Sequence, residues 1–153
     1  EEDGEWYLLS TSTTKAGANT NRDININIAS SYINGKILQP NEKFSFWDTV
    51  GKCTYDKGYK DATVYSNGKK TKGIGGGVCQ VSTTVNMAVK SAGIKTNARQ
   101  HSLPVSYASR EDEATVSFGN IDFKFTNTTG KTIMLVMGAV DGSCTCEVWA
   151  KYE

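Results

Sequence analysis

Three consecutive glycines run directly into an amphipathic stretch, and this junction constrains the fold more than any other segment. Residues 73–84 read Gly-Ile-Gly-Gly-Gly-Val-Cys-Gln-Val-Ser-Thr-Thr. Apolar residues recur at helical spacing from Val78 to Ala92, and Gly93 provides a C-terminal stop. The segment therefore predicts a helix that begins beside the glycines and carries Cys79 in its first turn.

A second helix is predicted for residues 22–34, where the apolar residues fit either a strand or one face of a helix. We favour the helix because Asn21 or Asp23 can cap its start, and Asn34-Gly35 can end it. Short strands are expected on either side of it: residues 6–9, which lead into a polar loop at 10–14, and residues 43–47.

The C-terminal half changes to a β pattern. Short strands are expected around turn residues: 114–118 with 121–125, 131–140 with 144–152, a run at 105–107, and a hairpin at Asn67-Gly68. A length of 153 residues suits one domain. We therefore predict a single α+β domain over residues 1–153, with a mixed or antiparallel sheet, a central helix carrying the cysteine at its N-terminus, and a C-terminal β-meander.

Charge and hydropathy argue against two classes of partner. The formal net charge is +1, without the excess of basic residues expected of a protein that binds nucleic acid. No apolar run approaches the roughly 18 residues that a membrane span needs. The chain begins Glu1-Glu2-Asp3 without Met, so we expect it to be excised from a longer protein.

One histidine and four cysteines narrow the possible chemistry. A single histidine excludes metal sites that need two or three imidazoles, but it can still serve as the base for one nucleophile. Cys79, in the first turn of the predicted helix, and His101, which follows that helix, form the candidate pair. The unpaired N–H groups and dipole of a helix N-terminus lower a thiol pKa and can hold an oxyanion. The alternatives are a buried, unreactive Cys79 and an ordinary surface His101.

A third residue that orients the imidazole cannot be selected by spacing. Asp112, Glu113 and Asp122 all follow the histidine, and a carboxylate from any of them could accept its ring N–H.

The remaining cysteines are Cys53, Cys144 and Cys146. Three thiols form at most one disulfide among themselves, and free thiols are equally compatible with the pattern. Cys-x-Cys without a Cys-x-x-Cys partner is a weak zinc pattern. We therefore expect neither a metal nor a cofactor.

Several motifs, in this order, resemble the VanW domain. They include Asn21-Arg22, Gly75-Gly76-Gly77-Val78-Cys79-Gln80-Val81-Ser82-Thr83-Thr84, His101-Ser102-Leu103-Pro104-Val105, Ala114-Thr115-Val116 and Asp122-Phe123-Lys124-Phe125. The resemblance runs from about Leu9 to about Asn127, and the glycine–cysteine and His-Ser-x-Pro-Val blocks are highly specific. One departure is Glu113, which stands where the family has Asp.

Some VanW-like proteins are described as peptidoglycan L,D-transpeptidases. The resemblance therefore implies that the chain forms 3-3 cross-links through a Cys79 thioester, with His101 as general base and acid. Glu113 or Asp112 would be the third catalytic residue. The residues expected to form the oxyanion hole or to bind substrate are Gly76, Gly77, Gln80, Ser82, Arg99 and Ser102, with Arg99 as a candidate anchor for a substrate carboxylate.

Members of the family face the cell wall, commonly behind an N-terminal membrane anchor, and the family is named after a protein of glycopeptide (vancomycin) resistance clusters. The resemblance thus implies an extracellular location, peptidoglycan stem peptides as partners, and membrane contact only through an anchor outside this chain. Two other functions remain open: a non-catalytic module that binds peptidoglycan or glycopeptide, and a cysteine cell-wall peptidase or carboxypeptidase. The pattern gives no oligomeric state.

Overall fold

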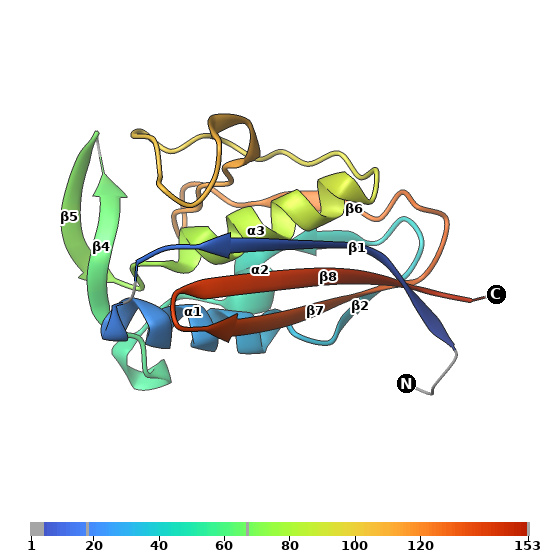
Figure 1. Ribbon diagram of the computed structural model, residues 1–153, viewed down its shortest axis with the longest axis horizontal. Coiled ribbons are helices and arrows are strands. Elements are labelled where there is room, and N and C mark those ends of the chain that lie inside the picture. The colour runs from blue at the N-terminus through green and yellow to red at the C-terminus, as the bar shows by residue number, and fades with distance from the viewer. Residues whose placement is uncertain (1–4, 18, 67, 153) are drawn as a thin grey trace.

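The centre of the molecule is a four-stranded antiparallel sheet with the strand order β1-β8-β7-β2. Its strands are β1 (Trp6–Lys15), β8 (Ser143–Lys151), β7 (Ile133–Val140) and β2 (Lys36–Leu38). The computed structural model describes residues 5–17, 19–66 and 68–152. Figure 1 shows the first and last strands side by side, because β1 pairs with β8 along nearly its whole length.

Two helices, α1 (Thr20–Ile33) and α3 (Val78–Ser91), cover one face of this sheet. Alternation along β8 buries Cys144, Cys146, Val148 and Ala150 completely in the resulting core. The two cysteines therefore face the same side of the strand, as their spacing predicts. All four cysteines of the chain are free thiols.

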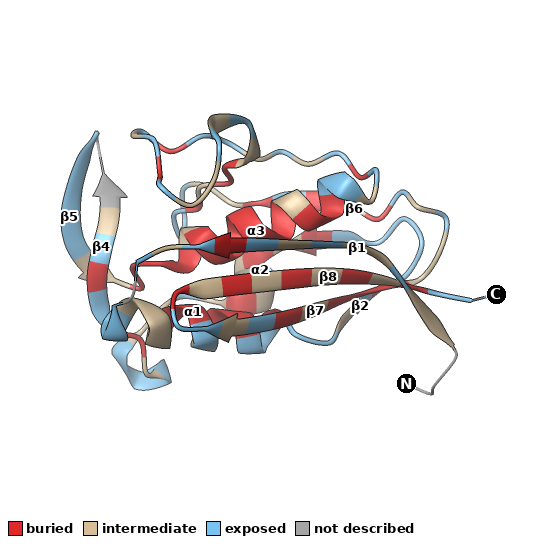
Figure 2. Ribbon diagram, viewed as in Figure 1, coloured by how far each residue is buried: buried red, intermediate tan, exposed pale blue. Residues whose placement is uncertain are grey.

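Helix α3 is also covered on the side away from the sheet, and Figure 2 shows it buried along most of its length. On that side, Ser82 donates to the Ala114 carbonyl at 2.5 Å, and Thr83 accepts the Ala114 N–H at 3.0 Å. The polar face of the helix therefore binds the backbone that follows the 3-10 turn η2 (Arg110–Asp112) and fixes its position.

Two small strand pairs and short helices lie outside the central sheet. Strand β4 (Asp61–Ser66) pairs with β5 (Lys69–Ile74), and β3 (Lys43–Ser45) pairs with β6 (Lys124–Thr126). The short helices are α2 (Phe46–Val50) and the 3-10 turn η1 (Tyr55–Lys57). Figure 1 shows the β4–β5 hairpin at the end of the molecule where α3 begins.

The predicted α+β class, the antiparallel sheet and the helix with Cys79 in its first turn are confirmed. The helix predicted for residues 22–34 is also present. Its cap differs from the expected Asn21 or Asp23, because the Asn19 side chain accepts the Arg22 N–H at 2.9 Å.

The polar loop predicted for residues 10–14 is wrong, because β1 continues to Lys15. The hydroxyl of Ser10 donates to the Ala88 carbonyl at 2.6 Å, and the hydroxyls of Thr14 and Thr84 lie 2.7 Å apart. Serine and threonine are accommodated in this strand because their inward-facing hydroxyls find partners on α3.

The strand predicted for residues 43–47 ends early, because the Ser45 side chain accepts the Asp48 N–H at 3.1 Å and caps α2. Residues 114–125 form no hairpin; they contain an isolated bridge between Ser117 and Ile121, and β6 pairs with β3 instead.

An aromatic contact accounts for this alternative pairing. The rings of Phe44 on β3 and Phe125 on β6 stack with their centroids 5.0 Å apart, and both are buried.

The remaining predictions have different outcomes. Residues 105–107 lie in a loop and not in a strand, whereas the β7–β8 hairpin matches the predicted C-terminal meander. The hairpin predicted at Asn67-Gly68 includes Asn67, which lies outside the described residues. Over the described chain, no helix combines the length and apolar character that crossing a bilayer requires.

Candidate active site

A cavity of about 680 Å³ opens at the N-terminal end of α3. It receives side chains from α1, from the start of α3, from the β4–β5 hairpin and from the loops before and after η2. Its lining includes Arg22, Cys53, Cys79, His101, Tyr107 and Thr115. The predicted thiol and imidazole, 22 residues apart in the sequence, therefore share one cavity.

The Cys79 thiol lies against the strand-like segment that follows Glu113. Its sulfur is 3.5 Å from both the N and the O atoms of Val116 and 3.7 Å from the Thr115 hydroxyl. Burial raises the pKa of the Cys79 thiol, although these hydrogen bonds and the nearby Arg22 charge act in the opposite direction. The helix N-terminus was expected to lower the pKa of this thiol. That prediction is wrong, because desolvation of the buried thiol raises its pKa and is the largest effect.

The amide groups of the first turn of α3 are partly used within the turn itself. The N–H of Val78 donates to the Gly75 carbonyl at 3.2 Å, and the N–H of Gln80 donates to the Gly77 carbonyl at 3.0 Å. Within the described residues, the Cys79 N–H has no acceptor outside the helix. The amide of Gln80, which was expected to contribute to the oxyanion hole, is therefore occupied, and the neighbouring amide of Cys79 is a free donor.

The imidazole of His101 is buried and held by one carboxylate. Its Nδ1 lies 3.0 Å from Glu113 Oε1, and its own backbone N–H donates to the same oxygen at 2.7 Å. Because a carboxylate only accepts hydrogen bonds, Nδ1 carries the proton and Nε2 carries the lone pair. The Tyr107 hydroxyl lies 3.4 Å from that Nε2 and donates to it.

Burial also lowers the pKa of His101, because the charged form loses solvation; the Glu113 carboxylate opposes this shift, while the charges of Arg110 and Arg22 add to it. Near neutral pH the imidazole is therefore uncharged. Cys79 and His101 therefore line the same cavity as a neutral thiol and a neutral imidazole. They do not form a thiolate–imidazolium pair.

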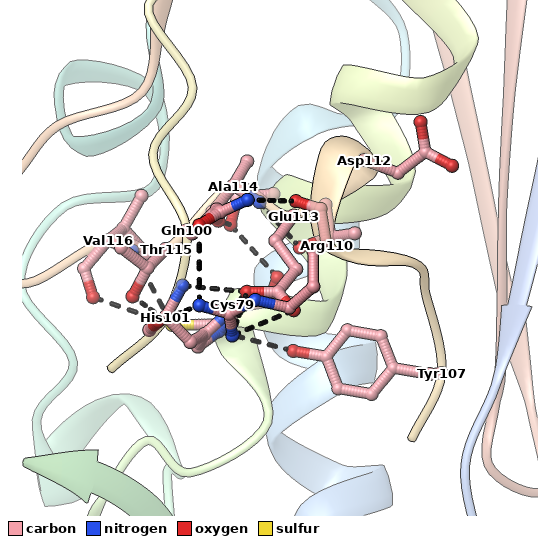
Figure 3. A network of polar contacts seen from close by, with 12 residues as sticks. Cys79, Gln100, His101, Tyr107, Arg110, Asp112, Glu113, Ala114, Thr115 and Val116 are labelled. Atoms are coloured by element: carbon pink, nitrogen blue, oxygen red, sulfur yellow. Dashed lines mark hydrogen bonds and ion pairs between the residues drawn. The ribbon is translucent and has the colours of Figure 1, made fainter. Parts of the chain in front are cut away.

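The two adjacent acidic residues have opposite surroundings. Glu113 is fully buried, and Arg110 Nη1 lies 3.4 Å from each of its carboxylate oxygens. Asp112 instead pairs with Lys90 at 3.4 Å near the surface. Figure 3 shows the Asp112 carboxylate directed away from the network around His101. The geometry thus brings Glu113, and not Asp112, to the imidazole.

Arg22 is a cation that sequence reasoning did not assign to the site. Its Nη2 donates to Gln80 Oε1 at 2.6 Å, and its guanidinium carbon lies 5.5 Å from the centroid of the Tyr107 ring. Its Nε is buried and has no acceptor among the described residues. The Gln80 amide is itself fixed, since its Nε2 donates to Thr14 and to the Gly142 carbonyl. The sequence signal was the Asn21-Arg22 motif, but nothing local connects it to residue 80.

The other predicted binding residues divide into two groups. Gly77 and Ser102 line the cavity. Gly76 lies under β4, where an added Cβ would come within 2.5 Å of the Ala62 backbone. Ser82 supports the backbone around residue 114, and Arg99 is exposed and lies outside the cavity lining, with its carbonyl accepting the Thr115 N–H.

Cys53 is an unexpected member of the cavity wall. Burial raises the pKa of its thiol, and the proximity of Cys79 adds to the rise. Across the described residues, no three His, Cys, Asp or Glu side chains are grouped so that they could hold a metal ion.

The chain is similar to a known protein family and to two known proteins. The VanW-like protein family model matches residues 21–149. The chain is 39% identical over 127 residues to the uncharacterized protein YoaR of Bacillus subtilis strain 168, covering 82% of this chain and 42% of that protein. It is 30% identical over 142 residues to the vancomycin B-type resistance protein VanW of Enterococcus faecalis strain ATCC 700802 / V583, covering 87% of this chain and 46% of that one. The chain thus spans less than half the length of these relatives, and no solved structure matches it significantly.

Proposed function

The chain belongs to the VanW-like protein family, and on that premise we propose that it is a cysteine acyltransferase forming 3-3 cross-links between peptidoglycan stem peptides at the outer face of the cell envelope. The observation that supports this most is the sharing of one cavity by the Cys79 thiol and an imidazole, His101, that a buried carboxylate orients. Acyl transfer by a cysteine enzyme uses a nucleophile, a base and a group that orients the base, and Cys79, His101 and Glu113 could supply one of each.

The first step is the transfer of the thiol proton. His101 is uncharged near neutral pH and Nε2 is its acceptor atom, so this nitrogen takes the proton as Cys79 Sγ attacks. Because burial keeps the resting thiol protonated, attack and proton transfer are coupled. The Tyr107 hydroxyl, now bonded to Nε2, has to yield that position during the reaction.

The attacked group is the carbonyl of the third stem residue, which is joined to a terminal D-Ala. The carbonyl oxygen becomes an oxyanion next to the Cys79 N–H, and the C–N bond to D-Ala then breaks. His101 returns its proton to the leaving amine, and a thioester remains. A side-chain amine of a second stem peptide attacks this thioester, forms the new amide and releases the thiol.

Arg22 supplies the cation that a terminal carboxylate needs. Arg22 lines the cavity that also holds Cys79 and His101, and its charge lowers the pKa of both groups. A guanidinium fixed by Gln80 and Tyr107 is suited to bind the D-Ala carboxylate. In this proposal Arg22 takes the role that the sequence suggested for Arg99.

The test uses a purified tetrapeptide muropeptide and mass spectrometry of the products. The wild-type chain should release D-Ala and form dimers, and Cys79→Ser should lower both by about a thousandfold or more. Cys53→Ser is the matched control, because it removes a second thiol from the same cavity without touching the proposed nucleophile. Equal turnover by wild type and Cys79→Ser would refute the mechanism, and D-Ala release without dimers would identify a carboxypeptidase.

One observation favours a non-catalytic binding module as the second candidate. Trp47 and Phe118 form an edge-to-face pair with centroids 5.4 Å apart in the cavity wall, and Phe118 is half-exposed. Such a pair can hold a sugar or peptide without chemistry. A module of this kind binds the muropeptide equally well with Cys79 or with Cys79→Ala and yields no product, which the same experiment detects.

A further inference from the structure

A second cavity, of about 840 Å³, lies on another part of the surface and shares no lining residue with the first. It is bounded by β2, β3, β6, α2 and the segment that follows α3. Among the residues that the structure describes, its wall contains one carboxylate, Asp48, and four lysines that come from four separate segments: Lys36, Lys43, Lys95 and Lys124. These ammonium groups are brought together by the folding of the chain. They do not come from a local run of basic residues in the sequence.

The charges of these four lysines are unpaired within the part of the chain that the structure describes. Within the described part of the chain, none of them forms an ion pair, whereas Lys90 and Lys151 elsewhere do. The whole chain has a formal net charge of only +1, so this cavity concentrates positive charge that the rest of the surface offsets. A wall with four ammonium groups and a single carboxylate attracts an anion.

The type of cation indicates the type of anion. Arginine, whose planar fork suits carboxylates, is absent from the described lining, and lysine ammonium groups bind phosphate oxygens as point charges from several directions. The hydroxyl residues Thr49, Thr126 and Thr128 add polar groups to the same wall. The spread of the lysines over a cavity this large suits several phosphates of one chain better than a single ion.

We propose that this lysine cavity, defined by Lys36, Lys43, Lys95 and Lys124, binds a polymer that carries repeated phosphate groups. The site is independent of the cysteine chemistry, because no described residue lines both this cavity and the cavity that contains Cys79 and His101. Its function is to hold the protein along a phosphate-bearing chain while the first cavity remains open.

The test measures binding of long-chain inorganic polyphosphate to the wild-type chain by calorimetry at two salt concentrations. The site variant changes the four lysines to glutamine (K36Q, K43Q, K95Q and K124Q). The matched control changes four exposed lysines elsewhere (K15Q, K60Q, K69Q and K72Q), so that both variants lose the same charge. The site variant should lose at least about tenfold in affinity and most of its salt dependence, because fewer counterions are released on binding. The control variant should keep at least half of the wild-type affinity.

Two further probes define the ligand. Orthophosphate alone should bind at least about a hundredfold more weakly, and polyglutamate, a carboxylate polymer, at least about tenfold more weakly than polyphosphate. Comparable binding of orthophosphate would refute the polymer, comparable binding of polyglutamate would refute the phosphate preference, and an equal loss in both variants would refute the site.

A measurement on the unaltered protein guards against misfolding of the site variant. Polyphosphate should protect the four cavity lysines from acetylation, read by mass spectrometry, while Lys15, Lys60, Lys69 and Lys72 remain reactive. Uniform protection, or none, would overturn the proposal.

Discussion

The buried carboxylate of Glu113 is the sharpest place to test the site, because changing it to glutamine preserves its shape and removes its charge. Its Oε1 accepts both the His101 N–H and the Nδ1 proton, and Arg110 reaches both oxygens. In Glu113→Gln the amide oxygen can still accept from His101, but both bonds lose their charge assistance, and the amide nitrogen turns a donor toward Arg110.

The expected size of the effect follows from these contacts. A hydrogen bond to a charged acceptor contributes about 1.5–3 kcal/mol and a neutral one about 1, so weakening two of them costs about 2 kcal/mol. The Arg110 pair adds little, since its side chain is 40% exposed and therefore screened by solvent. For a domain of this length, 2 kcal/mol corresponds to a decrease of about 4–8 °C in Tm.

The same substitution should lower the pKa of His101 further, because the Glu113 carboxylate is the group that raises it. The chain has a single histidine, so one imidazole C–H resonance in an NMR titration reports this pKa without ambiguity. If the acyltransferase proposal holds, turnover should also fall by about a hundredfold to ten-thousandfold, since the imidazole loses its orienting carboxylate.

The neighbouring carboxylate supplies the control. Asp112→Asn removes an exposed pair with Lys90, so it should change stability by less than about 1 kcal/mol and leave the histidine titration unaltered. A His101 pKa that rises or stays constant in Glu113→Gln, or that moves equally in Asp112→Asn, would refute the assignment of Glu113 as the orienting group.

Four further outcomes are expected. His101 has a lower pKa in the folded protein than in the unfolded chain, so the unfolded chain binds its proton more tightly. The free energy of unfolding should therefore decrease as the pH falls below about 6.5 and become constant below the pKa of the folded state. In urea titrations, His101→Gln should not show this pH dependence. Because burial raises the thiol pKa of Cys79, its alkylation, followed by peptide mass spectrometry, should be slow at pH 7 and still accelerate above pH 9; a plateau near neutrality would contradict this. Arg22→Gln should raise KM for a substrate with a free terminal carboxylate by about tenfold or more but not for its amide, and an equal effect on both would exclude carboxylate binding. Gly76→Ala should destabilise the fold by about 3 kcal/mol in urea, because the added Cβ meets the Ala62 backbone; an unchanged midpoint would show that β4 moves away freely.

Two members of the candidate site, Cys79 and His101, could be selected from the sequence because each carries a local signal. Cys79 follows a glycine run at a helix start, and His101 is the sole histidine, so each could be identified without knowing the fold. The choice between Asp112 and Glu113 could not be made in this way. Asp112 ends the 3-10 turn and Glu113 follows it in an extended conformation, so only the contacts of α3 with this segment determine which carboxylate is buried.

Long-range contacts explain most of the remaining differences. Arg22 meets a residue 58 positions away, and no periodicity reveals such a pair. The polar half of β1 resembles a loop in sequence because its partners lie on α3, 70 or more residues later. The turn residues that correctly indicated the β7–β8 hairpin are a local signal, since a hairpin brings its two strands together within a few residues.

The pairing of the first strand with the last has a consequence for how the protein reaches its native state. Gln80, which holds Arg22, is bonded both to Thr14 on β1 and to the carbonyl of Gly142 in the final turn. During synthesis β1 is made well before β8, and it cannot complete its ladder until β8 has been synthesised. Contacts that span nearly the whole chain make folding slow. The cavity around Cys79 therefore acquires its ordered arginine only after the β7–β8 hairpin has been synthesised, and a chain that stops before this hairpin would contain Cys79 and His101 but no fixed Arg22.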